Sequence, residues 1–387
     1  TGPEPRNISK QKEPRIVIEA DKKLQVYVLG ACDLFYAVGH MALPLVNLHY
    51  ECNTFYGDER GVNVGTEYIR SCFALNDDDK DFCRRHFYNY SGPSAFNTQI
   101  FAKEYDYVVL SFHDDMILDV YQSKRNPEMY VMRTDDVIRS KNSVIPPEGC
   151  DAKQWLEEEF TLLGRISPER FRENLQWIYD RLSSRTKMML MTGPEFDYYR
   201  DSRPKDPDSQ KQIILLNEVI REFCASHDRT VLIEINELIT KRHHFTNYIF
   251  HLAPERSYAL ASKILKLMAS YSDRKGEDIR KQLSIGQRKL ALCGSDSFLL
   301  PNYYTLCALG LKPDIIAAEK SGKIAEIIIE DLSKLYYGQN EFFVFITADQ
   351  NNESVQHTLE LYGYKPDKDY YILNPVKYNL EWKMERK

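Results

Sequence analysis

The segment QVYVLGACDLFYAVGH, residues Gln25–His40, joins an apolar run to a tight turn. Its first part, V-Y-V-L, has the composition of a short buried strand that ends at Gly30. A small residue, Ala31, then Cys32 and Asp33 follow, at the place where a strand would lead into a helix. Chains often end a buried strand in this way when the turn must hold a nucleophile in a cleft. Cys32 is therefore either such a nucleophile or a small buried residue at the end of a strand.

Length and composition limit the classes of protein to which the chain can belong. Its 387 residues favour two domains, and 43% hydrophobic and 28% charged residues are ordinary for a globular protein. The net charge of −6 provides no basic field for nucleic acid or anionic lipid. No apolar run approaches the roughly 20 residues that a membrane-spanning helix needs. We therefore expect neither a nucleic-acid partner nor a membrane span.

The cysteines and the N-terminal residues indicate a compartment. The eight cysteines form no C-x-x-C pair, so neither a zinc knuckle nor a dense disulfide framework is predicted. They are Cys32, Cys52, Cys72, Cys83, Cys150, Cys224, Cys293 and Cys307. Free thiols suit a reducing compartment, and we expect a cytoplasmic protein.

Residues 1–20 are polar and contain prolines, which predicts a flexible segment and not a signal peptide. The segment lacks an initiator Met, which suits a tag remnant, a trimmed end or a linker from an upstream segment.

Strand and helix patterns alternate along the first two thirds of the chain, which predicts an α/β architecture with a parallel sheet. The expected strands are residues 25–29, 107–112, 187–191 and 230–235. The expected helices are residues 167–182, 211–227 and 253–271. The first of these helices has Ser167 at the cap position and Pro168 at its first helical position.

A charged and weakly apolar stretch, residues 273–286, suits a domain boundary. A second alternating series follows, with strands expected at 289–294, 314–317, 341–349 and 369–373 and helices at 302–309 and 353–362. We therefore expect a first domain at residues 21–272 and a smaller Rossmann-like α/β domain at residues 287–387. The turn L-C-G-S-D-S-F of the second domain lacks the G-x-G-x-x-G fingerprint, and Asp296 in it would repel a pyrophosphate. Nucleotide binding in the usual way is therefore not expected there.

Several segments of the first domain, taken in order, resemble the SGNH (GDSL-like) hydrolase superfamily over about residues 20–272. The segments are G-A-C at 30–32, S-F-H-D at 111–114, M-T-G-P-E at 191–195, the helix and strand of 216–238, and H-L-A-P-E at 251–255. In the family these places hold the G-D-S nucleophile, the G-x-N-D block, a T-P-P-like turn, a helix and strand, and the catalytic histidine. The resemblance implies an SGNH-like three-layer α/β domain with a parallel sheet, acting as an esterase or acyltransferase.

Four positions depart from the family pattern. Cys32 stands in place of the nucleophilic serine, and Ala31 in place of the acid before it. His113 replaces the asparagine that donates to the oxyanion, and Tyr248 replaces the aspartate of the triad. Cysteine variants with a G-x-C turn and a Cys–His pair occur among capsule-polysaccharide acyltransferase-like proteins, which this chain resembles more closely than it resembles true esterases.

The chemistry of a Cys–His pair can be argued without the family. A thiol with a pKa of about 8.5 is activated by a nearby imidazole or a helix N-terminus. Cysteine needs less activation than serine, so the loss of an orienting carboxylate is less damaging to it. We expect Cys32 to attack an acyl carbonyl, His251 to transfer the proton, and His113 with backbone amides to hold the oxyanion. Gly65 and Gly92 both suit the second donor, and the sequence does not choose between them. The candidate substrate-binding residues are Asp33, Gly65, Gly92 and Asp114.

The resemblance implies a substrate that is a carbohydrate or a surface-polysaccharide precursor, with no tightly bound cofactor and with acetyl-CoA as donor if the protein is a transferase. A non-catalytic SGNH-like module that binds a glycan, a carrier or a partner protein is the main alternative, because several polar positions are changed together. A nucleotide-sugar enzyme that uses the second domain is a third hypothesis. A metal site formed by His113, Asp114, Asp115, His243 and His244 is not expected, since no H-x-x-x-H spacing exists. The sequence gives no oligomeric state.

Overall fold

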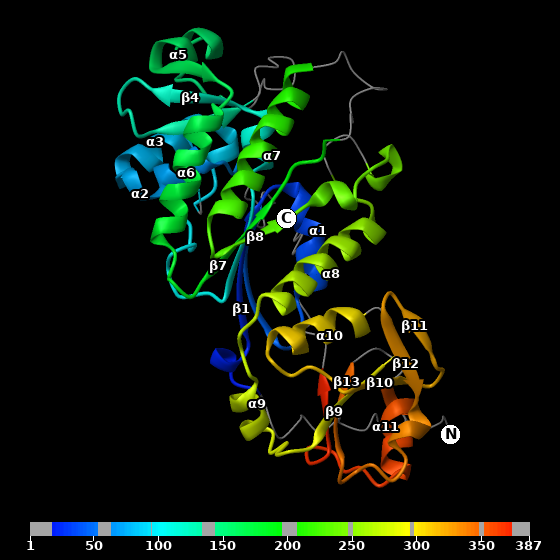
Figure 1. Cartoon of the computed structure of the whole chain (residues 1–387). Helices are drawn as coiled ribbons and strands as arrows, with labels where there is room; N and C mark the ends of the chain where they lie inside the picture. Colours follow the sequence, from blue (N-terminus) through cyan, green and yellow to red (C-terminus); the bar gives the residue numbers. More distant parts are fainter. Residues whose placement is uncertain are drawn as a thin grey trace, which may run out of the picture. The chain divides into compact units, whose positions relative to one another are not determined.

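The computed structural model describes residues 18–52, 63–93, 95–133, 144–195, 207–246, 251–294, 298–347 and 352–373. For Cys32, Cys52, Arg133, residues 207–209 and Asn352 the description covers the backbone alone. The described residues divide into two compact units, residues 24–271 and residues 18–23 with 272–373. Each unit is an α/β structure built on its own sheet (Figure 1).

The first unit contains a five-stranded parallel sheet in the order β2-β1-β3-β7-β8. Its strands are β1 (Leu24–Gly30), β2 (Val46–Cys52), β3 (Tyr107–Ser111), β7 (Lys187–Met191) and β8 (Thr230–Ile233). All five residues of β3 are buried, which agrees with a central strand that is covered on both faces. The predicted strands are confirmed as β1, β3, β7 and β8, whereas the sequence analysis missed β2. This strand lies at the sheet edge and alternates apolar with polar residues.

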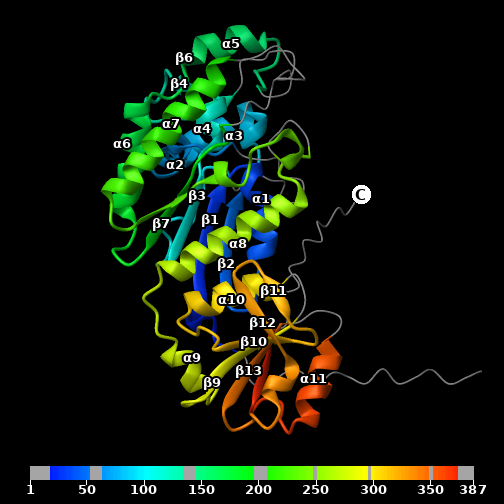
Figure 2. The ribbon, with the colours of Figure 1, turned by 45° about the vertical axis from the view of Figure 1, so that its right-hand side comes forward.

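Helices cover the two faces of this sheet. One pair, α1 (Cys32–Met41) and α8 (Pro254–Ser270), packs together, and so does a second pair, α6 (Pro168–Arg181) and α7 (Pro207–Ser226). Figures 1 and 2 show the two pairs on opposite faces, which gives three layers. The predicted cap of α6 is confirmed, since the Ser167 side chain accepts the Arg170 N–H at 3.2 Å and Pro168 occupies the first turn.

Two connections of the first unit are larger than the sequence analysis anticipated. Between β2 and β3 lie α2 (Thr66–Ala74), α3 (Asp77–His86) and the 3-10 turn η2 (Tyr88–Tyr90). Between β3 and α6 lie α4 (His113–Ile117), β4 (Asp119–Ser123), β5 (Tyr130–Arg133), α5 (Ala152–Glu159) and β6 (Phe160–Gly164). The three strands form a separate antiparallel sheet in the order β5-β4-β6. Two short 3-10 turns, η3 (Ile235–Glu237) and η4 (Arg242–His244), follow β8.

The second unit contains a six-stranded sheet in the order β11-β12-β10-β9-β13-β14, in which only the β11–β12 pair is antiparallel. Its elements are α9 (Glu277–Gln282), β9 (Lys289–Cys293), α10 (Leu299–Ala308), β10 (Ile315–Ala318), β11 (Gly322–Ile324), β12 (Ile327–Asp331), η5 (Leu332–Leu335), β13 (Phe342–Thr347), α11 (Asn352–Leu361) and β14 (Tyr370–Leu373). Six of these elements, namely β9, β10, β13, β14, α10 and α11, were expected from the sequence. The elements α9, β11 and β12 were not predicted from the sequence.

The second unit also takes up residues near the start of the chain. The turn η1 (Ala20–Lys22) belongs to it, Ile18 is buried, and the Arg274 guanidinium donates to the Lys23 carbonyl at 3.2 Å. The charged stretch 273–286 includes α9 and is part of this unit. Residues 1–17 of the expected flexible segment lie outside the described residues.

Candidate active site

The order of strands in the first sheet directs attention to one place on its edge. The chain runs from β1 to β2 on one side of β1, and later to β3 on the other side. In open α/β sheets ligands bind at such a switch point, outside the carboxyl ends of the two strands. The residues that follow β1 begin with Ala31 and Cys32, and those that follow β3 begin with Phe112 and His113. The topology therefore brings two of the predicted catalytic positions to the edge where a ligand is expected.

Cys32 is the first residue of α1, and Ala31 before it has extended backbone. The first N–H groups of a helix have no partner within the helix, and they carry the positive end of the helix dipole. A helix N-terminus is one of the environments that lower the pKa of cysteine thiols in proteins.

His251 lies three residues before the first residue of α8, which packs against α1. Its ring meets the ring of Tyr36 edge-on, with the centroids 5.7 Å apart. Tyr36 is four residues after Cys32, so both residues occupy the same face of α1. His251 is partly buried, and this burial lowers the pKa of its imidazole. The imidazole of His251, which is neutral near pH 7, therefore lies beside α1 at a point one helical turn after Cys32.

Asp33 connects the turn after β1 to the end of β3. Its carboxylate accepts the Ser111 hydroxyl at 2.6 Å and the Leu34 N–H at 2.9 Å. Burial raises the pKa of Asp33 to about 6 in spite of these hydrogen bonds. Because both carboxylate oxygens bind within the fold, Asp33 fixes the position of the α1 N-terminus relative to β3.

His113, Asp114 and Asp115 form the first turn of α4 and are all buried. Burial lowers the pKa of His113 to about 4, so its imidazole is neutral near pH 7. Asp114 accepts the Val64 N–H and Asp115 the Thr66 N–H, each at 2.7 Å. The segment after β3 therefore binds the turn that leads into α2.

The structure distinguishes the two glycines that the sequence left as alternatives. Gly65 lies between Val64 and Thr66, directly at the N-terminus of α2. Gly92 lies in the turn after η2, where its carbonyl accepts the Ala95 N–H at 3.0 Å. Of the two, it is Gly65 whose neighbours bind the segment that carries His113.

The T-G-P-E turn after β7 is held by a polar network that the sequence analysis did not find. Glu234 accepts from the Thr192 hydroxyl at 2.7 Å and from Arg221 Nε at 2.8 Å. Glu195 accepts from Arg221 Nη2 at 2.8 Å and from Asn217 Nδ2 at 2.9 Å. Burial alone would raise the pKa of Glu234, but the hydrogen bonds from Arg221 and Thr192 outweigh it and lower the pKa to about 2. The two carboxylates neutralise Arg221 and fix the turn against the end of β8.

Some positions singled out in the sequence lie elsewhere or cannot be placed. Tyr248 and the turn that contains Asp296 lie outside the described residues. His243 and His244 are in η4, with ring centroids 4.7 Å apart. Within the described part of the chain, no three His, Cys, Asp or Glu residues are grouped so that they could hold a metal ion. The same residues include no helix that is both long enough and apolar enough to cross a membrane.

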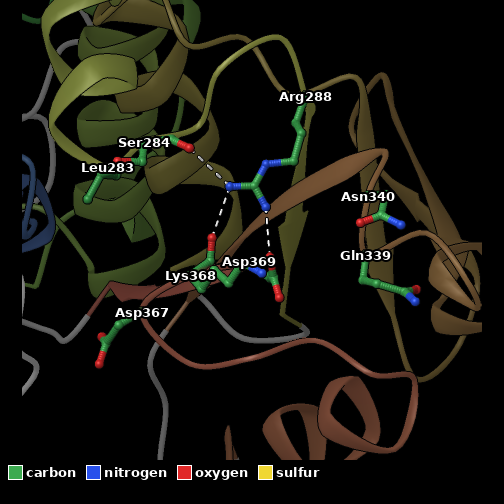
Figure 3. Close-up of a pocket in the computed structure, with 8 residues that line it drawn as sticks. All are labelled: Leu283, Ser284, Arg288, Gln339, Asn340, Asp367, Lys368 and Asp369. Atoms are coloured by element: carbon green, nitrogen blue, oxygen red, sulfur yellow. Dashed lines mark hydrogen bonds and ion pairs between the residues drawn. The ribbon is translucent and has the colours of Figure 1, made fainter.

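A pocket of about 450 Å³ lies in the second unit, apart from the residues described so far (Figure 3). Its lining residues are Leu283, Ser284, Arg288, Gln339, Asn340, Asp367, Lys368 and Asp369. The Arg288 guanidinium donates to the Asp369 carboxylate at 2.9 Å and to the carbonyls of Lys368 and Ser284 at 2.9 and 3.2 Å. These bonds neutralise the cation and join the residue before β9 to the residues before β14. The polar contacts among these lining residues thus form a structural clamp.

Comparisons with known proteins give distant structural similarities. No protein-family model and no curated protein matches the chain. A proposed arylesterase from Agrobacterium tumefaciens aligns with 62% of this chain and 96% of its own, at 12% sequence identity and a TM-score of 0.32. The N-terminal part of a Bacteroides fragilis protein, which contains a phosphatase domain and is complexed with Mg, aligns with 92% of this chain and 85% of its own, at 9% identity and a TM-score of 0.30. Likenesses of this size identify neither a family nor an activity.

Proposed function

We propose that the first unit hydrolyses or transfers acyl groups, with Cys32 as nucleophile and His251 as its general base. The observation that carries the proposal is the contact of the His251 ring with Tyr36, one turn after Cys32 on the same face of α1. The switch point of the sheet lies at the start of this helix. A helix N-terminus and a neutral imidazole both favour ionisation of a thiol.

The reaction would proceed in two steps. His251 takes the proton of Cys32, and the thiolate attacks the acyl carbonyl, which gives a tetrahedral oxyanion. The oxyanion collapses to a thioester on Cys32, and the leaving group departs with the proton held by His251. Water or an acceptor hydroxyl then attacks the thioester while His251 removes its proton, and the thiolate is regenerated.

Two groups are suited to hold the oxyanion. A neutral His113 carries one ring N–H, and its low pKa keeps the ring from becoming charged near pH 7. The Gly65 N–H is the second donor, because the neighbours of Gly65 bind the segment that carries His113. Donors of this kind stabilise the developing charge without reorganisation during the reaction.

We assign the substrate class by analogy. The G-x-C turn and the His251 segment resemble capsule-polysaccharide acyltransferase-like proteins, so the proposed substrate is an acylated carbohydrate or a surface-polysaccharide precursor. In a transferase acetyl-CoA would donate the acyl group to Cys32, and the thiolate of coenzyme A would leave. No tightly bound cofactor is required by this scheme.

The pH dependence of Cys32 alkylation by iodoacetamide tests the dyad. Mass spectrometry of the Cys32 peptide gives the rate in the wild type, in His251→Ala and in the matched control His243→Ala, since His243 is exposed. The exposed Cys150 serves as a reference thiol on the same chain. We expect an apparent pKa for Cys32 well below about 8.5 that rises in His251→Ala and not in the control. A Cys32 that is inert, or indifferent to His251, would refute the covalent mechanism and favour a non-catalytic binding module.

A further inference from the structure

Two successive carboxylates hold the turn that leads into α2. Asp114 Oδ2 lies 2.7 Å from the Val64 nitrogen, and Asp115 Oδ2 lies 2.7 Å from the Thr66 nitrogen. Both carboxylates are buried, and they belong to the short helix that follows β3. The two hydrogen bonds therefore fix the backbone on either side of Gly65 to the edge of the central sheet.

This arrangement leaves the Gly65 N–H in a distinct orientation. Gly65 has extended backbone, with φ −128° and ψ 177°. Successive N–H groups of an extended chain point to opposite sides, so those of Val64 and Thr66 point to the Asp114 and Asp115 side chains and that of Gly65 points to the side opposite these two carboxyl groups. Among the described residues, the Gly65 N–H has no hydrogen-bond acceptor. The Gly65 N–H is therefore the backbone donor of this turn that can bind a ligand.

Glycine is needed at this position because the carboxylate approaches the backbone closely. A Cβ added to Gly65 would lie 2.6 Å from Asp115 Oδ1 and would also collide with the sulfur of Met132. Gly65 is the N-cap of α2 and has no side chain with which to cap it. Asp115 supplies the missing acceptor from a different segment of the chain.

Other contacts hold the two ends of the turn. The Asn63 side chain donates to the Met132 carbonyl at 2.8 Å. At the other end, the Thr66 hydroxyl accepts from Asn174 at 3.1 Å. The turn is therefore anchored on both sides of Gly65, which is the condition for a preorganised donor.

We propose that Asp114 and Asp115 are positioning residues that orient the Gly65 N–H as an oxyanion donor for the reaction at Cys32. This inference rests on the proposed function. Neither carboxylate touches the substrate, and both act through the backbone of residues 64–66. Their loss should therefore affect the transition state more than substrate binding.

The test compares alanine and asparagine variants at both positions. Alanine removes the acceptor, whereas the carbonyl of asparagine can still accept the same N–H, so Asp114→Asn and Asp115→Asn serve as conservative controls that keep the fold. Hydrolysis of p-nitrophenyl acetate gives kcat and KM, hydrogen exchange reports the amides of residues 63–66, and iodoacetamide reports the Cys32 thiol. Glu218→Gln, which changes an exposed carboxylate on α7, is the control for a change of charge.

We expect Asp114→Ala and Asp115→Ala to lower kcat by about 10- to 100-fold, somewhat less than removal of an oxyanion donor itself, with KM and Cys32 alkylation unchanged. Exchange at residues 63–66 should rise in the same variants, and the asparagine variants should retain most of the wild-type kcat. Faster exchange without any loss of kcat would overturn the inference, and so would an equal loss of kcat and of alkylation. A wild type with no Cys32-dependent turnover would instead refute the proposed function and this inference with it.

Discussion

Replacing Asp114 with asparagine should change how the stability of the first unit depends on pH. Burial, together with the charge of Asp33, raises the pKa of Asp114 to about 7, and the hydrogen bond from Val64 only partly opposes this rise. In an unfolded chain the same carboxyl has the usual pKa of an aspartate, about 3.9. Between these two values the folded chain binds a proton that the unfolded chain does not. The free energy of unfolding therefore falls as the pH rises through this interval.

The expected change in the free energy of unfolding follows from the pKa values of Asp114 in the folded and the unfolded chain. They differ by about 3, which corresponds to about 4 kcal/mol at a pH well above 7, and about 2.5 kcal/mol of this change falls between pH 5 and pH 8. Asparagine does not titrate, and its unpaired amide N–H costs about 1–3 kcal/mol at either pH. The free energy of unfolding of Asp114→Asn, relative to the wild type, should therefore rise by about 2.5 kcal/mol from pH 5 to pH 8.

Guanidinium denaturation followed by tryptophan fluorescence measures this difference, because Trp155 and Trp177 both lie in the first unit. Asp33, whose pKa is also raised, titrates in both proteins, so only the part of its contribution that depends on the charge of Asp114 enters the difference. Glu218→Gln controls for the change of charge at an exposed carboxylate. A difference between Asp114→Asn and the wild type that is the same at both pH values would refute the reasoning.

Two further predictions concern a buried ion pair in the first unit and a close packing contact in the second unit. Arg170→Ala leaves the buried carboxylate of Glu67 without the guanidinium that binds it at 2.5 Å, and should lower the free energy of unfolding by about 3 kcal/mol. Arg172→Ala, which breaks a surface pair with Glu222, should cost at most about 1 kcal/mol in the same denaturation experiment, and equal effects would contradict the burial argument. Gly294→Ala would press a Cβ against the Thr347 hydroxyl and should destabilise the second unit by about 1–3 kcal/mol, measured by circular dichroism. Gly322→Ala, where the added Cβ meets open space, should have no comparable effect, and a stable Gly294→Ala would count against the close approach of β9 and β13.

The sequence predicted best those elements whose signals are local. The apolar runs of β1, β3 and β7 are continuous because these strands are covered on both faces, and the helix after Ser167 carries its own cap. Edge and insertion strands carry weaker signals. β2 alternates polar and apolar residues, and β4 and β6 contain partly or fully exposed residues, so none of the three forms a continuous apolar run.

The details of the candidate site depend on contacts between distant segments, which one sequence does not reveal. Our proposal of Gly65 instead of Gly92 rests on hydrogen bonds that join residues 50 and 49 positions apart in the chain. The order of the G-A-C, S-F-H-D and H-L-A-P-E segments suggested the region, because the turns after β1 and β3 share one sheet edge. It did not reveal that Asp114 and Asp115 would bind the backbone next to Gly65. The partners of the T-G-P-E turn were hidden for the same reason.

Trapping of an acyl group on Cys32 is the most direct test of the central claim. The wild type, Cys32→Ala and His251→Ala are mixed with p-nitrophenyl acetate, quenched with acid within the first turnover, digested and mapped by mass spectrometry. The account predicts an acetyl thioester on the Cys32 peptide of the wild type, reduced in His251→Ala, while the exposed Cys150 is acetylated only slowly and equally in all three proteins. An unmodified Cys32, or turnover that persists in Cys32→Ala, would contradict it.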